Sequence, residues 1–342
     1  MNASQLVFAA PRQIEIRPIQ LEPPDAGQLL VANRLSAISA GTEMLIYRGH
    51  APQEMAIDAT LPALRGLLRY PLTYGYASVG RVLEVGPGVD PLWRGRRVFA
   101  YQPHASHFLA QVDQVLALGE DLADEDAVFI PNLETAVSLV QDGRPILGEA
   151  VVVFGQGIVG LLVTRLLSRL PLGALVALER YPLRRQASLE LEPTACLDPS
   201  ISDLPAQLAH ALPTGRSDLT FELSGDPSAL NQALSITGFT GRVVLGSWYG
   251  TQPTQLDLGG EFHRSRIQIV SSQVSTIAPE LSGRWTKQRR LQVVLQLLPQ
   301  IAPRRWITHS VDFGDAPEAY RLLDQQPETT LQVVLRYPGS DA

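Results

Sequence analysis

One glycine-rich stretch, VVVFGQGIVGLL, holds the residues of this sequence whose types and spacing most clearly indicate chemistry. It places Gly155, Gly157 and Gly160 in the pattern G-x-G-x-x-G, after an apolar strand-like run and at the start of an apolar helix-like run. In this pattern the first glycine permits a tight turn, the second lets a pyrophosphate approach the backbone, and the third lets helix and strand pack closely. The free N–H groups at the helix start attract the phosphates. The stretch therefore predicts a dinucleotide-binding loop and not a glycine turn without a ligand.

An acidic residue follows this loop at the distance expected for a ribose contact. Glu179 ends the next predicted strand, ALVALE, where a carboxylate accepts both hydroxyls of an adenosine ribose and repels a 2′-phosphate. Arg180, Arg184 and Arg185 come next, and an arginine nearby can instead hold that phosphate. We therefore predict NAD as the cofactor and keep NADP as the alternative. The residues that we assign to the cofactor site are Gly155, Gln156, Gly157, Ile158, Val159, Gly160, Glu179, Arg180, Thr135, Ser224, Gly246 and Ser247.

The elements that position this loop alternate between strand and helix. Within residues 126–273, apolar runs such as EAVVVFG and GALVALE alternate with helical patterns such as IVGLLVTRLLSRL, which builds a parallel sheet with helices on both faces. Residues 1–125 instead indicate strands and turns, and residues 274–342 return to mixed structure. We predict an α/β fold, with a Rossmann doubly wound domain at 126–273 and a β-rich domain formed by 1–125 and 274–342. The segment 50–70 is too long for a hairpin turn, and we expect a helix or a lid there.

Composition narrows the class of protein. The 342 residues exceed what one core usually supports, and the net charge of −6 argues against a nucleic-acid binder. No run approaches the roughly 18 apolar residues of a membrane span, and the N-terminus lacks the pattern of a signal peptide. Cys196 is the only cysteine, which excludes a cysteine-based zinc site and suits a reducing compartment. We predict a cytoplasmic protein with no membrane partner and with Cys196 as a core residue.

The order of these parts resembles the medium-chain dehydrogenase/reductase superfamily, to which the alcohol dehydrogenases belong. SAISAGTE resembles the active-site loop of that superfamily, and YPLTYGYASVGRVLEVGPGV resembles its glycine-rich segment. The segments SAGTE, YGYASVG, VFAYQPH and NLETA are more similar to a zinc-lacking branch, and the N-terminal part has a weaker similarity to bacteriochlorophyllide hydroxyethyl dehydrogenases. The resemblance implies a GroES-like fold for the β-rich domain, a catalytic role for that domain, and a homodimer.

The resemblance also implies that the catalytic metal is missing. Aligned with the zinc-dependent members, Ala40 takes the place of the cysteine ligand, and Tyr76 and Ala77 replace the histidine and glutamate of G-H-E. The third ligand position falls near Pro131. A catalytic zinc ion needs three protein ligands and an open position. We therefore predict a zinc-independent enzyme without a bound metal.

Hydrogen-bond donors must then replace the metal, because hydride transfer to a carbonyl builds negative charge on oxygen. The resemblance gives Thr42 the position of a proton-relaying hydroxyl and gives Tyr76 a former ligand position, and His104 lies on the nearby VFAYQPH loop as an acid or relay. We predict these three as the catalytic residues. Their structural alternatives are a turn hydrogen bond for Thr42 and simple packing for Tyr76. His104 and His107 form an H-x-x-H pair, but residues three apart on a strand face opposite sides and a third ligand is not evident.

These features together predict an NAD(P)-dependent oxidoreductase. It would move hydride between nicotinamide C4 and a carbonyl, alcohol or activated double bond of a small-molecule substrate. One alternative is a non-catalytic nucleotide-binding or redox-sensing protein, and another is a dehydrogenase of a large, apolar, tetrapyrrole-like alcohol roofed by segment 50–70. We expect Glu43 and Glu134 to orient other groups, each with an Arg or N–H partner, for which Arg48 and Arg81 are candidates.

Overall fold

The computed structural model describes residues 1–58 and 60–338. The chain divides into two compact units, Met1–Pro131 with Leu298–Ala342 and Asn132–Leu297. Helices α3 (Ile130–Gly143) and α8 (Lys287–Ile301) carry the chain across the two boundaries. The sequence pattern placed these boundaries earlier, near 125 and 274.

A buried ion pair gives the physical reason for the later second boundary. Arg290, at the start of α8, is 1% exposed and donates from Nε and NH2 to Oε1 of Glu134 on α3, at 3.2 and 2.9 Å. A buried charge is costly unless it is paired, and this pair therefore holds the first turns of α8 to the second unit. It also identifies the arginine partner that we expected for Glu134.

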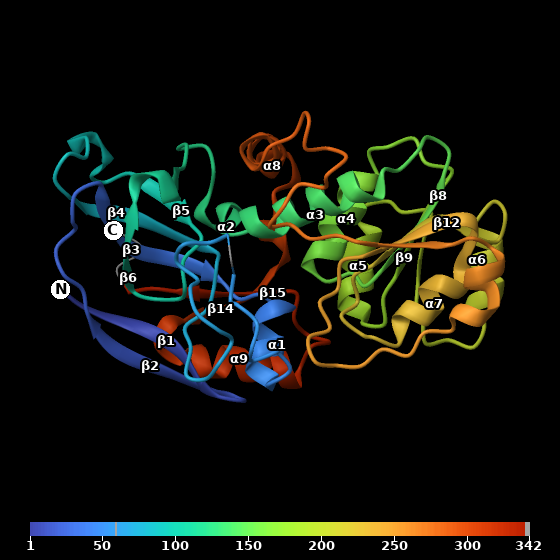
Figure 1. Cartoon of the computed structure of the whole chain (residues 1–342), viewed down its shortest axis with the longest axis horizontal. Helices are drawn as coiled ribbons and strands as arrows, with labels where there is room; N and C mark the ends of the chain where they lie inside the picture. The colour runs from blue at the N-terminus through green and yellow to red at the C-terminus, as the bar shows by residue number, and fades with distance from the viewer. Residues whose placement is uncertain (59, 339–342) are drawn as a thin grey trace. The chain divides into compact units, whose positions relative to one another are not determined.

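A parallel sheet forms the centre of the second unit (Figure 1). In the described part of the chain it has six strands, in the order β10-β9-β8-β11-β12-β13, and all its neighbouring strands are parallel. The order reverses between β8 and β11, and doubly wound sheets bind ligands at such a switch point. The strands are β8 (Ala150–Phe154), β9 (Ala174–Leu178), β10 (Ala195–Leu197), β11 (Ser217–Glu222), β12 (Thr237–Leu245) and β13 (Gln268–Ser271).

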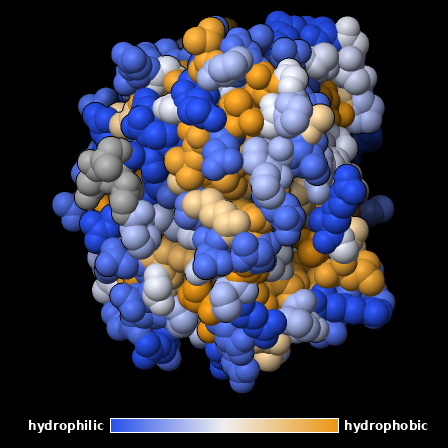
Figure 2. Space-filling view, turned by 90° about the vertical axis from the view of Figure 1, so that its left-hand side faces the viewer, coloured by the Kyte–Doolittle hydropathy of each residue, from blue (hydrophilic) through white to orange (hydrophobic). Residues whose placement is uncertain are grey.

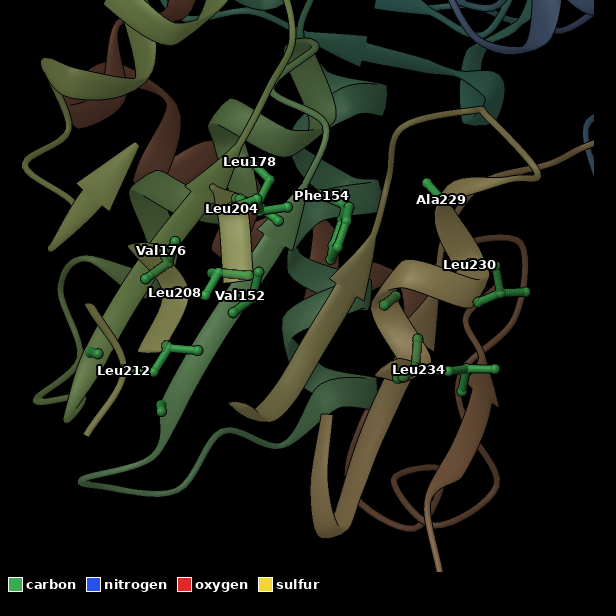
Figure 3. Close-up of a cluster of buried hydrophobic side chains, with 14 of the residues drawn as sticks. Val152, Phe154, Val176, Leu178, Leu204, Leu208, Leu212, Ala229, Leu230 and Leu234 are labelled. Atoms are coloured by element: carbon green, nitrogen blue, oxygen red, sulfur yellow. The ribbon is translucent and has the colours of Figure 1, made fainter. Parts of the chain in front are cut away.

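Apolar side chains from strands and helices form the core of this unit. The strands AVVVF and ALVAL are buried along their whole length, as expected for central parallel strands covered on both faces. Figure 3 shows Leu204 and Leu208 of α6 near Val152 of β8 and Val176 of β9, and Leu230 and Leu234 of α7 belong to the same buried cluster. Leu204 and Leu208 recur at the four-residue spacing that places side chains on one helix face. The helices are α4 (Ile158–Leu167), α5 (Pro182–Leu189), α6 (Leu204–Ala211) and α7 (Ala229–Ile236).

The first unit combines a mixed sheet with a two-stranded antiparallel ribbon. The described strands of the sheet run in the order β14-β15-β3-β4-β5-β7, with β6 paired to β3, and β1 and β2 form the ribbon. Leu29 and Val31 alternate inward on β3 and pack with Val82 and Val98, as the period of a half-buried strand predicts. The strands are β1 (Asn2–Ala10), β2 (Gln13–Gln20), β3 (Gln28–Ala37), β4 (Ser78–Val85), β5 (Arg97–Ala100), β6 (His107–Gln111), β7 (Val115–Ala117), β14 (Ile307–Asp312) and β15 (Gln332–Arg336).

The C-terminal part of the chain completes this sheet. Strand β15 pairs antiparallel with β3, so that Leu335 lies opposite Ser36 and Val334 lies opposite Ala37. The pairing brings the end of the chain to the start of the SAISAGTE stretch. The helices of this unit are α1 (Thr42–Arg48), α2 (Asp124–Ala127) and α9 (Ala316–Gln325), and the short 3-10 helices are η1 (Pro91–Trp93), η2 (Val112–Gln114), η4 (Pro303–Trp306) and η5 (Phe313–Asp315).

The segment 50–70 forms turns and a short bridge, so the expectation of a helix there was wrong for the residues that the structure describes. Ala56 pairs with Leu67, and Ile57 N–H donates to the Gly66 carbonyl at 3.0 Å. Pro52 and Pro62 restrict helical backbone, and Gly66 has a positive φ of 105°, which explains why no helix forms.

The surface is of mixed polarity. Figure 2 shows one face of the molecule, on which apolar residues gather along the middle and hydrophilic residues cover most of the sides. Exposed apolar side chains of this kind are normal, since apolar atoms contribute more than half of an ordinary protein surface. Among the described residues, no helix combines the length and apolar character needed to cross a membrane.

Candidate active site

The glycine loop after β8 has a different geometry at each of its glycines. Gly155 has a φ of 83°, and a Cβ there would meet the Ser224 Cα at 2.6 Å, so the turn requires glycine. A Cβ on Gly160 would lie 1.9 Å from the Gly155 carbonyl oxygen, which shows how closely helix α4 approaches the loop. Gly157 is open, with only the Arg184 NH1 atom at 4.0 Å from a Cβ there. Space for a ligand therefore lies at the middle glycine, where the N-terminus of α4 begins.

Glu179 follows β9 and lies beside this loop. Its Oε2 accepts the backbone N–H of Gln156 at 2.8 Å, and its Oε1 accepts that of Tyr181 at 2.9 Å. The side chain is buried. The Glu179 carboxylate therefore fixes the conformation of the glycine loop, and it lies at the position predicted to contact the ribose.

The arginines after Glu179 are arranged around Tyr181. The guanidinium carbons of Arg180 and Arg184 lie 4.8 and 4.9 Å from its ring centroid, which is the geometry of cation–π contacts. Arg185 instead donates to the Glu179 carbonyl at 2.8 Å and to the Asp198 carboxylate at 3.0 Å. Arg180 and Arg184 are therefore the candidates for a 2′-phosphate, while Arg185 stabilises the turn.

Ser224 and Ser247 lie around a buried carboxylate that sequence reasoning missed. Glu222, at the end of β11, is fully buried and accepts the Ser224 N–H at 2.8 Å and the Tyr249 hydroxyl at 2.6 Å. Burial and then the charge of Glu222 raise the pKa of Tyr249. Ser247 Oγ accepts the Gly225 N–H at 2.9 Å. This network shapes the loops at the carboxyl ends of β11 and β12.

The remaining assigned residues of the second unit lie on elements next to these loops. A Cβ on Gly246 would lie 2.5 Å from Leu223 Cδ2, so a side chain here would displace that leucine. Ile158 and Val159 form the first turn of α4, and Thr135 lies on α3.

Tyr76 and Thr42 lie close together in the first unit, beside Ser39, which was not among the predicted residues. The side chains of Ser39 and Thr42 interact with the Tyr76 phenol and lower its pKa. Burial, and to a lesser degree the nearby charge of Glu43, raise the pKa of Tyr76 to about 12. Ser39 Oγ also accepts the Thr42 N–H at 3.2 Å, which fixes the start of α1. Tyr76 is therefore a neutral O–H donor at neutral pH, surrounded by hydroxyl groups.

Glu43 lies at the centre of a buried network behind this group. It is fully buried; its Oε1 accepts the Ser39 N–H at 2.8 Å, and its Oε2 accepts His104 Nε2–H at 3.0 Å and the Tyr320 hydroxyl. Three donors therefore converge on this one buried carboxylate. Glu43 thus orients the loop, as we expected.

The arginine partners proposed for Glu43 were wrong. Arg48 Nε instead bonds Asp324 Oδ1 at 2.6 Å, and Arg81 NH1 donates to the Gly95 carbonyl at 3.5 Å. The partners of Glu43 are instead a backbone N–H, an imidazole and a phenol.

His104 lies behind Glu43 and is fully buried. A carboxylate can only accept, so Nε2 carries a proton and donates to Glu43, while Nδ1 lies 2.7 Å from the Ser36 hydroxyl. Ser36 Oγ also hydrogen-bonds the Tyr337 hydroxyl at 2.8 Å. Gly75, at a φ of 124°, leaves room for the ring, since a Cβ there would lie 2.7 Å from His104 Cδ2. Both ring nitrogens are engaged, so His104 acts on the site through Glu43 and not by direct contact with solvent.

The residues of the first unit do not fit a catalytic zinc ion. Ala40 offers no donor atom, and Tyr76 presents a neutral phenol with a raised pKa. His107 Nδ1 lies 3.1 Å from Ser106 Oγ, while His104 bonds Glu43, so the two histidines do not share a site. Within the described residues, no three His, Cys, Asp or Glu side chains gather to hold a metal ion.

Several residues of this network were missed, and some had a signal in the sequence. Ser36 and Ser39 lie within the SAISAGTE stretch itself, and hydroxyls beside a catalytic loop are reasonable candidates. Tyr320 lies in APEAYRLLD and Tyr337 follows β15, and nothing local indicates that either reaches this loop. Their contributions depend on the pairing of β15 with β3 and on the placement of α9.

A scan against protein-family models gives no match. D-guloside 3-dehydrogenase of Escherichia coli (strain K12) is 24% identical over 346 residues, which span 96% of this chain and 98% of that protein. 2-Desacetyl-2-hydroxyethyl bacteriochlorophyllide A dehydrogenase of Cereibacter sphaeroides is 35% identical over 101 residues, which span 29% of this chain and 27% of that protein.

Solved structures show the same architecture over nearly the whole chain. The rspB alcohol dehydrogenase of Escherichia coli CFT073, solved with NADH, matches with a TM-score of 0.78 at 20% identity and covers 98% of this chain and 99% of its own. A protein described as a zinc-binding dehydrogenase of Sinorhizobium meliloti 1021, bound to NADP, gives 0.75 at 18% identity, with 98% and 99% covered. The chain therefore has the fold of the medium-chain dehydrogenases, with Rossmann and GroES-like domains, and the predicted fold class is confirmed.

Proposed function

We propose that this protein is an NAD(P)-dependent oxidoreductase of the medium-chain dehydrogenase/reductase superfamily that works without zinc and uses Tyr76 as its proton donor. One observation carries the proposal. The hydroxyls of Tyr76, Ser39 and Thr42 lie close together, in the segments that the resemblance aligns with the zinc-binding positions of the zinc-dependent members. The full-length similarity to named dehydrogenases supports the oxidoreductase class.

The second unit supplies the groups for a dinucleotide. The open backbone at Gly157 and the N–H groups at the start of α4 suit a pyrophosphate, and Glu179 suits a ribose. When bound, the reduced nicotinamide supplies the hydride. We propose NAD as the preferred cofactor because the Glu179 carboxylate is held at the loop by backbone N–H groups. NADP remains the alternative because Arg180 and Arg184 are placed to contact a 2′-phosphate.

Tyr76 is suited to give a proton and poorly suited to take one. Its pKa of about 12 keeps the phenol protonated at neutral pH, where it can hydrogen-bond a substrate carbonyl. An alkoxide is a stronger base than a phenolate and would take the Tyr76 proton, which Thr42 and Ser39 hydroxyls can then help to replace. Deprotonating Tyr76 first, as alcohol oxidation requires, costs about 1.4 kcal/mol for each unit between its pKa and the pH. We therefore propose that the enzyme works in the direction of carbonyl reduction.

The buried network has a positioning role in this proposal. The Glu43 carboxylate accepts the Ser39 N–H and so positions the Ser39 and Thr42 hydroxyls around Tyr76. His104 and Tyr320 donate hydrogen bonds to Glu43 and keep its carboxylate in place. Thr42 and Tyr76 are the groups that would touch substrate or relay its proton. His104 is proposed as a positioning residue because its ring is fully buried and doubly bonded.

The substrate class is proposed from the named relatives. Two relatives are named for oxidation of a sugar derivative and of a butanediol, and we propose a small polyol or ketose of that chemical class. The short match to the bacteriochlorophyllide A dehydrogenase keeps a tetrapyrrole-like substrate as the alternative. The homodimer and the cytoplasmic location stay predictions.

A combined binding and turnover assay tests the proposal. Purified protein is analysed for metal content, titrated with NADH and NADPH, and then screened against hydroxyketones, sugars and enones. We expect tight binding of one cofactor, no stoichiometric zinc, and oxidation of the reduced cofactor by at least one carbonyl substrate. Stoichiometric zinc required for turnover would contradict the mechanism. Cofactor binding without turnover of any substrate would favour the non-catalytic alternative.

A further inference from the structure

A cavity of about 410 Å³ lies in the first unit, where the segment before Leu72 meets the β1–β2 ribbon. Its lining residues include the apolar Val7, Leu67 and Leu72 and three arginines, Arg17, Arg65 and Arg69. The volume falls in the range of about 300–1,000 Å³ that small-molecule pockets occupy. A small organic ligand could therefore fit.

The cavity lies on the other face of β1 from the Glu43 network. Successive residues of a strand point to opposite faces, and Val7 precedes Phe8. The Phe8 ring contacts Tyr320 edge-on, with centroids 5.3 Å apart, and Tyr320 donates to Glu43. Arg17 pairs across the ribbon with Gln5, on the same face as Val7. Val7 and the cavity thus face away from the Tyr76 group.

The rim of the cavity is built by an ordered turn segment. Leu68 N–H donates to the Met55 carbonyl at 3.0 Å, and the bridge between Ala56 and Leu67 continues this pairing. Gly66, at its positive φ, makes the turn between Arg65 and Leu67. Leu67 stays 41% exposed although it lines the cavity. The segment therefore leaves both the apolar side chain of Leu67 and the neighbouring arginines accessible to a ligand.

The charges of this cavity are unbalanced. Arg17 pairs with Glu15 at 2.8 Å and Arg69 pairs with Glu54, but these pairs are exposed and worth little. Arg65 makes no hydrogen bond or ion pair with any residue that the structure describes. No carboxylate is among the described residues that line the cavity. In a chain of net charge −6, clustered guanidinium groups of this kind favour an anion.

We propose that this cavity binds a small amphiphilic anion, whose carboxylate or phosphate group contacts Arg65 and whose apolar body covers Leu67 and Leu72. A guanidinium matches both anions with two parallel N–H···O bonds, and these charge-assisted bonds are stronger than neutral ones. Arg17 and Arg69 add positive potential. Burying the exposed part of Leu67 adds an apolar contribution. The site is independent of the proposed redox function, because it faces away from Tyr76.

Calorimetric titration of the full chain tests this site with four probes: octanoate, octyl phosphate, octan-1-ol and inorganic phosphate. We expect octanoate or octyl phosphate to bind at least tenfold more tightly than either of the other two, and the two anionic amphiphiles distinguish carboxylate from phosphate. Arg65→Ala should weaken the tighter probe by about 10- to 100-fold. Arg94→Ala, a change at an exposed arginine outside the cavity, should leave the affinity unchanged.

A second variant and a cofactor titration complete the test. Leu67→Asn should weaken octanoate or octyl phosphate and leave inorganic phosphate unaffected, and NADH affinity should stay the same in every variant, which also reports an intact fold. Equal binding of octan-1-ol and octanoate, equal affinity of Arg65→Ala and the unmodified protein, or no binding of any probe would overturn the proposal.

Discussion

Replacing Tyr320 by phenylalanine tests the buried network around Glu43. The change removes the hydroxyl that donates to Glu43 Oε2 and leaves the ring, which packs against Phe8 and Tyr47 with centroids 5.3 and 5.6 Å away. No cavity forms, so the loss is that of one hydrogen bond to a buried carboxylate. Such bonds contribute about 1.5–3 kcal/mol. We expect the free energy of unfolding of the first unit to fall by about 2 kcal/mol.

Urea unfolding measures this loss, and Tyr47→Phe provides the matched control. The Tyr47 ring packs on Tyr320 and is buried, but its hydroxyl makes no hydrogen bond with any residue that the structure describes. With a slope of about 2 kcal/mol per molar urea, Tyr320→Phe should lower the midpoint by about 1 M. Tyr47→Phe should shift it by less than about a quarter of that. Equal shifts in the two variants, or an unchanged midpoint for Tyr320→Phe, would refute the role given to the Glu43 network.

Two further predictions follow from the tyrosines and the glycine loop. Burial raises the pKa of Tyr74 and raises that of Tyr76 to about 12, whereas the pKa of an unfolded tyrosine is near 10. The stabilisation from these two neutral phenols should therefore be complete below pH 10. Above pH 10 the free energy of unfolding should fall by about 1.4 kcal/mol per pH unit for each tyrosine. Urea unfolding at pH 9, 10 and 11 measures this; a stability that is flat across that range would contradict the burial of these phenols. Gly157→Asp should weaken NADH binding by at least tenfold without lowering stability, because its Cβ enters open space and its charge repels phosphate, whereas Gly160→Ala should destabilise the second unit by about 2 kcal/mol or more. Fluorescence titration with NADH and thermal unfolding separate the two effects, and the opposite order of effects would show that the loop geometry is wrong.

Local sequence patterns were sufficient for the central strands and the glycine loop of the second unit. AVVVF and ALVAL are continuous apolar runs of five residues that are rich in β-branched residues or follow a glycine directly, and such short runs favour buried central strands. The glycines of the loop each carry a separate local constraint, so their positions could be predicted one by one. The sheet order then follows from the right-handed connections that parallel strands require.

Long-range partners could not be predicted in the same way. The Glu43–Tyr320 and Ser36–Tyr337 contacts join residues 277 and 301 positions apart, and they depend on the register of β15 against β3. No local pattern specifies such a register. The sequence indicates that an acidic residue in a buried loop needs a partner but not which residue supplies it, and for that reason neither candidate, Arg48 or Arg81, is the partner of Glu43.

Turnover by metal-depleted protein is the most direct test of the central claim that Tyr76 takes the place of zinc. Protein treated with a chelator and verified to be zinc-free is assayed for reduction of its best carbonyl substrate, beside Tyr76→Phe at the same cofactor saturation. We predict full activity without metal, and a loss of about 10²- to 10⁴-fold in kcat for Tyr76→Phe with unchanged NADH affinity. Activity that disappears on chelation and returns with added zinc, or a Tyr76→Phe variant as active as the unmodified protein, would contradict it.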